Sequence, residues 1–125
     1  MTLTDIQSNN EFYELIASLE NQQLKYIVAY YYSPSCLQCK YIARPIFLKL
    51  YELYKDNNLI SFIQIDTSNE NIKEICIKCN VNVIPSTIIF EYVDSKIKCD
   101  MLCGKNIPKI IDKINDVMNI KKNVD

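Results

Sequence analysis

Histidine is absent from this 125-residue chain, and glycine occurs only once. Without histidine the chain cannot use Cys–His nucleophilic catalysis, histidine acid–base chemistry or a mixed Cys/His zinc site. A single glycine cannot form a glycine-rich phosphate-binding loop. The formal net charge of −1 provides no global field that attracts nucleic acid or an anionic membrane. We therefore expect no nucleic-acid partner.

Long hydrophobic runs are also lacking. The longest apolar runs, such as residues 26–32, are far too short to span a bilayer. The N-terminal residues Met1–Asp5 lack the basic-then-apolar pattern of a secretory signal peptide. We therefore expect no membrane partner and a cytoplasmic location. In that reducing compartment the six cysteines are better explained as thiols than as a framework of disulfides.

The remaining composition is that of one globular domain. Hydrophobic residues make up 49% of the chain and charged residues 23%, which is an ordinary balance. A chain of this length can bury a core, and no repeat, linker or low-complexity tract divides it. We therefore expect a single domain over residues 1–125, present as a monomer.

The hydrophobic pattern predicts alternating strands and helices. Ser8–Glu11 has the form of a capping box, and helical spacing follows it. Residues 26–32 form a continuous apolar run, which is typical of a strand covered on both faces. From Cys36 the spacing becomes helical, and Pro45 predicts a kink in that helix. We expect strands near 3–6, 26–32, 59–65, 87–92 and 96–103, and helices near 9–20, 36–55, 72–79 and 107–118.

The order of these elements is β-α-β-α-β-α-β-β-α. Buried strands that alternate with helices imply an α/β fold with a mixed central sheet and helices on both faces. The last two strands form a hairpin, so one edge of the sheet is expected to be antiparallel.

Cys36 and Cys39 lie where the predicted strand 26–32 gives way to a helix. Free N–H groups and the helix dipole at such a junction stabilise a thiolate and lower the pKa of a thiol from about 8.5. A second thiol three residues later can reach back to resolve a mixed disulfide. The position predicts a redox centre, and two buried structural thiols are the alternative. Lys40 and Arg44 follow on the same helix; we interpret them as solvated charges, with attraction of anionic partners or of a thiolate by Lys40 as the lesser alternative.

The segment Tyr31–Lys40, YYSPSCLQCK, resembles the active-site segment of the thioredoxin family, and it is closest to that of protein disulfide isomerase-type domains. Val83–Thr87 resembles the cis-proline loop of that family. Gly104 matches the glycine that follows the last strand and borders the substrate groove. The spacing of these landmarks fits the family over nearly the whole chain, and it implies a thioredoxin fold.

The resemblance also implies a role for each matching residue. Cys36 is the nucleophile and Cys39 the resolving thiol, and the reaction needs no bound cofactor. The backbone at Ile84–Pro85 pairs with an extended substrate peptide beside Cys36. An exposed apolar Leu37 at the helix start suits contact with a protein. The expected substrate-binding residues are Ser35, Leu37, Val83, Ile84, Pro85, Cys103 and Gly104.

The chain departs from the family at several positions. Tyr30 stands where the family has a buried Asp, and Phe62 stands where it has a Lys partner. Ser35 replaces a Trp, Leu37–Gln38 replaces Gly-Pro or Gly-His, and Arg44 occupies the usual position of the kink proline. A buried acid helps to move the proton of the resolving thiol, whereas the reference pKa of tyrosine is near 10. We therefore expect slow reduction of disulfides rather than a loss of exchange.

The other four cysteines have open interpretations. Cys76 and Cys79 form a second CxxC pair, for which core filling, a Cys₄ zinc site with the first pair and a second redox pair remain possible. Both fall on an apolar stripe, so core filling is favoured. Cys99 and Cys103 share one face of a strand, roughly 13 Å apart at about 3.3 Å per residue, which is too far for a bond. We expect Cys99 in the core, and packing or a mixed disulfide at the groove rim for Cys103.

The leading hypothesis is a thiol–disulfide oxidoreductase that acts on protein disulfides through Cys36 and Cys39. Its partners would be disulfide-containing client proteins and an electron donor such as a thioredoxin reductase or a small thiol. The alternative is a non-catalytic thioredoxin-fold module that binds proteins, which the missing acid and the missing Trp favour and the retained cysteine pair opposes. A glutaredoxin-like protein fits less well, because no glycine pair follows Pro85 to hold a glutathione carboxylate.

Overall fold

The strands and helices follow the hydrophobic pattern closely. The computed structural model describes residues 3–103 and residue 112. Gly104 and, apart from Asp112, the helix expected near 107–118 lie outside the described residues. Within the described part of the chain, no helix is long and apolar enough to cross a membrane. The elements are β1 (Thr4–Asp5), α1 (Asn9–Glu20), β2 (Tyr26–Tyr32), the π-helical turn η1 (Cys39–Ala43), α2 (Arg44–Tyr54), β3 (Ile60–Asp66), the 3-10 turn η2 (Glu70–Ile72), α3 (Lys73–Lys78), β4 (Ser86–Val93) and β5 (Lys96–Cys103).

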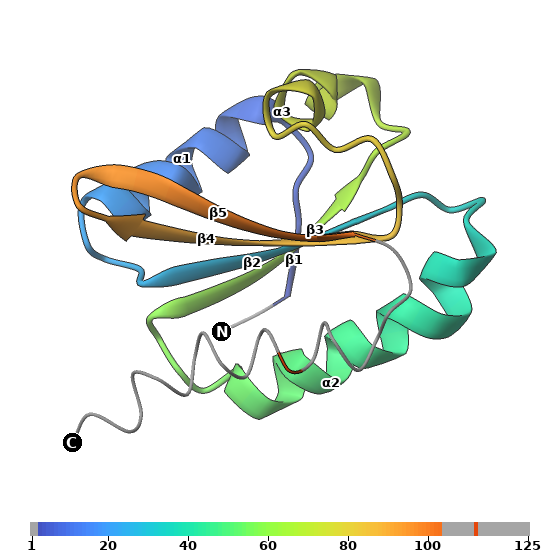
Figure 1. The fold of residues 1–125 in the computed structure, drawn as a ribbon, viewed down its shortest axis with the longest axis horizontal. Helices are drawn as coiled ribbons and strands as arrows, with labels where there is room; N and C mark the ends of the chain where they lie inside the picture. The colour runs from blue at the N-terminus through green and yellow to red at the C-terminus, as the bar shows by residue number, and fades with distance from the viewer. Residues whose placement is uncertain (1–2, 104–111, 113–125) are drawn as a thin grey trace.

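The five strands form one mixed sheet in the order β1-β3-β2-β4-β5. Strands β1 and β2 pair in parallel with β3, β4 pairs antiparallel with β2, and β5 pairs antiparallel with β4. Helices α1 and α3 cover one face of the sheet, and α2 covers the other (Figure 1). The expected mixed sheet with helices on both faces is therefore confirmed.

Each face of the sheet has its own core. Because successive side chains of a strand point to opposite faces, Ala29 and Tyr31 belong to the core on the side of α1 and α3. Val28 and Tyr30 belong to the core on the side of α2. The continuous apolar run of β2 thus contributes to two cores, and the strand that leads to Cys36 is buried from Tyr26 to Tyr31.

The capping box at Ser8 forms much as predicted. The Ser8 hydroxyl accepts the N–H of Glu11 at 3.3 Å, and α1 begins at the next residue, Asn9. The Glu11 carboxylate accepts the N–H of Gln7 at 3.0 Å, one residue earlier than in the usual box. Two backbone donors at the start of the helix therefore have side-chain partners.

The helix that follows Cys36 is irregular just before Pro45. The backbone is helical from Leu37, widens into the π turn η1 and then continues as the regular helix α2. The N–H of Arg44 donates to the Cys39 carbonyl, five residues back. Pro45 has no N–H to contribute to a regular ladder, and a π turn is a common form of such irregularity. The distortion expected at Pro45 thus takes the form of a π turn beside the disulfide.

The expectation that Cys99 lies in the core was wrong. Cys99 pairs with Phe90, which belongs to the core on the side of α1 and α3, yet Cys99 is exposed. Strand β5 is the edge of the sheet, so its side chains have a neighbouring strand on one side only. Cys76 and Cys79 are partly buried and pack against the same core, as core filling required.

Candidate redox site

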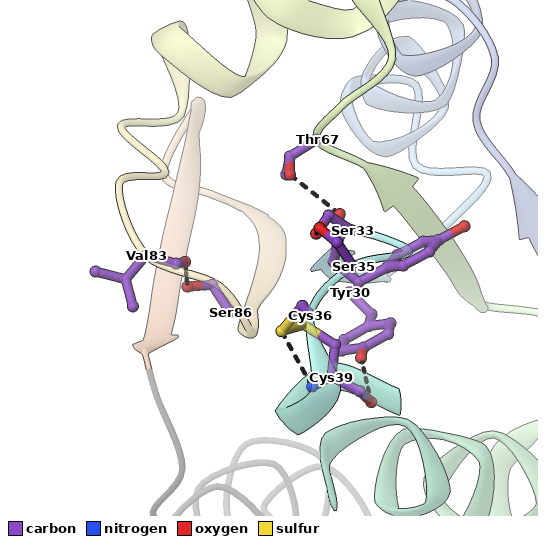
Figure 2. Close-up of a disulfide and its surroundings, with 9 residues drawn as sticks. Tyr30, Ser33, Ser35, Cys36, Cys39, Thr67, Val83 and Ser86 are labelled. Carbon is purple, nitrogen blue, oxygen red and sulfur yellow. Dashed lines mark hydrogen bonds between the residues drawn. A yellow bond between two sulfur atoms is a disulfide. The ribbon is translucent and has the colours of Figure 1, made fainter. Parts of the chain in front are cut away.

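Cys36 and Cys39 form a disulfide between the end of β2 and the start of the helix (Figure 2). Their Cα atoms are 5.3 Å apart. Cys36 is partly exposed, whereas Cys39 is only 2% exposed. Cys36 is therefore the cysteine of the pair that is more accessible to a second molecule.

Backbone hydrogen bonds fix Cys36 in the first turn of the helix. Its N–H donates to the Ser33 carbonyl at 3.1 Å, and its carbonyl accepts the N–H of Lys40 at 3.2 Å. The N–H of Cys39 points at the sulfur of Cys36, with nitrogen and sulfur 3.1 Å apart. A backbone donor aimed at sulfur stabilises negative charge there, so this arrangement favours the thiolate of reduced Cys36.

Thr67, the residue after β3, holds the end of β2 that precedes the disulfide. Its N–H and its hydroxyl both donate to the Tyr32 carbonyl, at 2.8 and 3.1 Å. Beyond this anchor, the hydroxyls of Ser33 and Ser35 are hydrogen-bonded to each other at 3.3 Å. The turn that leads into Cys36 is therefore tied to the sheet at its first residue (Figure 2).

The segment expected to meet substrate lies beside the end of β2. The peptide bond of Ile84–Pro85 is cis. Because Ser86 is in register with Tyr31, this segment continues alongside the last residues of β2. Ile84 packs against the same core as Cys36. The Ser86 hydroxyl donates to the Val83 carbonyl, and the Val83 side chain is 52% exposed (Figure 2).

The other expected substrate-binding residues are placed as follows. Leu37 is 68% exposed at the start of the helix, and Ser35 is also exposed. The backbone of Cys103 lies opposite Ser86 at the end of β5, close to the cis peptide bond. Gly104 lies outside the described residues. The structure therefore brings Leu37, Ser35 and the cis-proline segment to the same end of the sheet as the disulfide.

The hydroxyl of Tyr30 donates a hydrogen bond to the Cys39 carbonyl at 2.9 Å, a contact that the sequence did not predict (Figure 2). Tyr30 is 1% exposed, and its ring stacks on Phe47 at 5.0 Å and on Tyr32 at 5.5 Å between centroids. Burial raises the pKa of Tyr30 to about 12, although the Arg44 guanidinium opposes the shift. At neutral pH Tyr30 is therefore a neutral donor to the backbone and does not accept a proton.

Phe62 extends this aromatic stack on the α2 side of the sheet. Its ring meets Phe47 and Tyr51 edge to face, with centroids 5.7 Å apart in each pair. Phe62 is 2% exposed. Where the resemblance implies a buried acid and its Lys partner, this chain therefore has packed aromatic rings.

A cavity of about 270 Å³ adjoins Cys39. Lys40 and Arg44 face it from consecutive turns of the helix. Neither forms an ion pair with any residue in the described part of the chain, where the three ion pairs involve other lysines. The lining residues are Tyr30, Tyr32, Ser33, Pro34, Cys39, Lys40 and Arg44. Sequence reasoning missed this cavity; the only signal was the spacing of two cations one turn apart after the CxxC pair.

The second CxxC pair is remote from the first. Cys76 and Cys79 pack against the core on the side of α1 and α3, whereas Cys36 and Cys39 belong to the opposite face of the sheet. The two pairs therefore do not form a common Cys₄ site. Among residues 3–103 and 112, no three Cys, Asp or Glu side chains are grouped to hold a metal ion. Burial raises the pKa of both Cys76 and Cys79, which makes them weaker nucleophiles at neutral pH.

Comparison with known proteins places these observations in a family. The family model for thioredoxin matches residues 4–116. The comparison with curated proteins gives no match. Similar solved structures include thioredoxin from Trypanosoma brucei brucei (24% identity, TM-score 0.72, 94% of this chain and 92% of that chain covered), the oxidized form of mitochondrial thioredoxin 3 from Saccharomyces cerevisiae (24%, 0.71, 91% and 94%) and oxidized thioredoxin O1 from Arabidopsis thaliana (18%, 0.75, 93% and 97%). These likenesses show a shared fold.

The mixed sheet with helices on both faces is thus a thioredoxin fold. The chain belongs to the thioredoxin family. Family membership, together with the bonded Cys36–Cys39 pair, supports thiol–disulfide oxidoreductase activity in general.

Proposed function

We propose that this protein reduces or exchanges disulfides of client proteins, with Cys36 as the attacking thiol and Cys39 as the resolving thiol. The observation that carries the proposal is the difference between the two sulfurs. Cys36 is accessible and has the N–H of Cys39 aimed at its sulfur at 3.1 Å, whereas Cys39 is 2% exposed. Attack needs an accessible thiolate, while resolution needs only a thiol within reach of Cys36.

The reaction proceeds by two exchanges. The Cys36 thiolate attacks one sulfur of the client disulfide, a new S–S bond joins the two proteins, and the other client sulfur leaves as a thiolate that takes up a proton. The Cys39 thiol then loses its proton and attacks the Cys36 sulfur, which releases the second client thiolate. Two electrons pass to the client, and the protein is left with the Cys36–Cys39 disulfide. A reductase or a small thiol returns the two electrons.

The surface around Cys36 suits an extended peptide. Val83 is 52% exposed beside the cis Ile84–Pro85 bond, and Leu37, the residue after Cys36, is 68% exposed. Tyr41, one helical turn after Leu37, is 66% exposed. Exposed apolar side chains that flank a reactive thiol support contact with a protein client, because desolvating them favours association.

The second exchange is expected to limit the rate. In the described site the hydroxyl of Tyr30 donates a hydrogen bond to the Cys39 carbonyl, and burial raises the pKa of Tyr30 to about 12. Among the described residues that line the cavity beside Cys39 there is no carboxylate. The proton of Cys39 must therefore pass to solvent or to the departing thiolate, without the positioned base that speeds proton transfer by a typical factor of about 10²–10⁴.

Insulin reduction tests the proposal. With dithiothreitol as the reductant, the parent protein should accelerate the precipitation of insulin B chain, Cys36→Ser should not, and the matched control Cys76→Ser should match the parent. Replacing dithiothreitol with glutathione separates a glutaredoxin-like protein, which would use it efficiently. A folded parent protein with no acceleration under either reductant would contradict the proposal and favour a non-catalytic module that binds proteins.

A further inference from the structure

The cavity beside Cys39 is lined by two cations, Lys40 and Arg44, that have no role in the proposed disulfide exchange. Its walls come from both sides of the thiol pair in the sequence: Ser33 and Pro34 precede Cys36, and Lys40 and Arg44 follow Cys39. Its volume of about 270 Å³ lies just below the range of about 300–1,000 Å³ for sites of drug-sized ligands. The cavity therefore fits one side chain or part of a small molecule.

The cations of this cavity have no acidic partners among residues 3–103 and 112. Lys40 and Arg44 are both exposed, and neither is in an ion pair within the described part of the chain. Tyr32, which lines the cavity, donates a hydrogen bond to Asp5 at 3.5 Å, but neither Asp5 nor Asp66 lines the cavity. The end of the cavity next to Cys39 thus has a net positive charge.

Arg44 acts electrostatically on two tyrosines that line the cavity. Burial raises the pKa of both Tyr30 and Tyr32, and for both the Arg44 guanidinium opposes the shift. The guanidinium therefore acts on the hydroxyls of both lining tyrosines, and at Tyr32 the carboxylates of Asp5 and Asp66 outweigh it. A planar guanidinium can also hold a carboxylate through two parallel hydrogen bonds.

The cavity is lined by Cys39, the disulfide partner of Cys36, and by Ser33 and Pro34, which precede Cys36 in the sequence. The Cα atoms of Cys36 and Cys39 are 5.3 Å apart, and one extended residue spans about 3.3–3.6 Å. A group one or two residues from the substrate's own cysteine can therefore enter. We propose that the cavity beside Cys39 receives a carboxylate of the disulfide substrate, so that the protein exchanges fastest with disulfides that have a negative charge close to the sulfur.

This proposal rests on the disulfide exchange proposed above and adds a substrate class to it. Two kinds of substrate can supply this carboxylate: a client protein with an acidic residue next to its cysteine, or a small disulfide such as glutathione disulfide. In either case the carboxylate offsets part of the positive charge of Lys40 and Arg44 while Cys36 is joined to the substrate. Each exposed pair should change the rate constant about two- to fivefold, the range for solvent-exposed ion pairs.

The experiment measures second-order rate constants for oxidation of the reduced protein by paired disulfides. One pair consists of short peptide disulfides with Glu or Gln beside cysteine; the other consists of glutathione disulfide and its carboxyl esters. The Glu-to-Gln rate ratio in the parent should exceed one and should fall about two- to fivefold in Arg44→Gln or Lys40→Gln. It should fall less in Arg44→Lys, which keeps the charge but not the two parallel hydrogen bonds. Lys49→Gln, which removes an exposed cation of α2 outside the cavity, should keep the parental ratio.

The readout is a ratio, so a general loss of reactivity does not imitate the effect. Charge dependence in the peptide pair identifies a client side chain, and charge dependence in the glutathione pair alone identifies a small disulfide. Equal ratios in the parent and in Arg44→Gln, or the same fall in Lys49→Gln, would overturn the proposal. Neutral bis(2-hydroxyethyl) disulfide distinguishes the two proposals, because a parent protein that fails to react with any of these disulfides refutes the exchange activity itself.

Discussion

Replacing Tyr30 with Asp should speed disulfide exchange and destabilise the fold. The change places a carboxyl group in the aromatic stack beneath Cys39, where Tyr30 is 1% exposed. An ionised carboxylate is costly to desolvate there, so burial raises its pKa from about 4 toward neutrality. A group that titrates near the working pH is the most effective acceptor for the proton of the resolving thiol.

The cost in stability follows from what Tyr30 contacts. Truncating a large buried side chain costs about 3–5 kcal/mol, and the hydrogen bond to the Cys39 carbonyl contributes about 1 kcal/mol, partly within that figure. The Cys39 carbonyl keeps the N–H of Arg44, so it is not left without a donor. A loss of about 4 kcal/mol is large against the usual total of about 5–15 kcal/mol. Adding Phe62→Lys supplies a partner for the carboxylate and should recover part of the loss.

The assay combines insulin-reduction rates with urea midpoints for the parent, Tyr30→Asp and Tyr30→Asp/Phe62→Lys. Tyr30→Asn is the matched control, because it makes the same cavity without an acid. The Asp variant should be faster than both the parent and the Asn variant. An Asn variant as fast as the Asp variant would show that loosened packing, not proton transfer, limits the parent. A folded Asp variant with the parental rate would show that proton transfer from Cys39 is not limiting.

Three further outcomes are expected. Tyr30→Phe should cost about 1 kcal/mol in urea unfolding at pH 7; since burial raises the folded pKa of Tyr30 to about 12, above the unfolded value of 10, the advantage of the parent should be lost between pH 10 and about 12. Ser8→Ala should lower the free energy of unfolding by about 1 kcal/mol, because it removes the cap of α1. In the reduced protein at pH 7, mass mapping should find Cys36 alkylated before Cys76 and Cys79, because burial raises the pKa values of the latter two. Alkylation of Cys76 or Cys79 before Cys36 would refute the higher reactivity assigned to Cys36.

The elements that could be predicted are those that local sequence determines. Strand β2 occupies Tyr26–Tyr32 as expected, because seven apolar residues are bounded by a lysine and by a Ser-Pro-Ser turn. Helix α1 begins after Ser8 because a hydroxyl three residues before Glu11 can cap it. The junction that presents Cys36 follows directly from these neighbouring patterns.

The interactions that could not be predicted depend on tertiary placement. The Tyr30 hydroxyl finds the Cys39 carbonyl because the π turn η1 follows at that point, and no residue pattern specifies which carbonyl a buried phenol will meet. Cys99 is exposed because β5 is the edge of the sheet. The sequence alone does not show this, because the alternating pattern of β5 is the same as that of a strand covered on one face. The cavity beside Cys39 depends on the separation of β2 from the helix, which composition does not determine.

The central claim is that Cys36 attacks and Cys39 resolves, and trapping the mixed disulfide tests it most directly. Reduced Cys39→Ser protein mixed with insulin should accumulate a covalent adduct whose mass and fragment map place the bond at Cys36. Reduced Cys36→Ser protein should form no comparable adduct, because Cys39 is 2% exposed. An adduct at Cys39 in the Cys36→Ser protein that forms as fast as the Cys36 adduct would contradict the account.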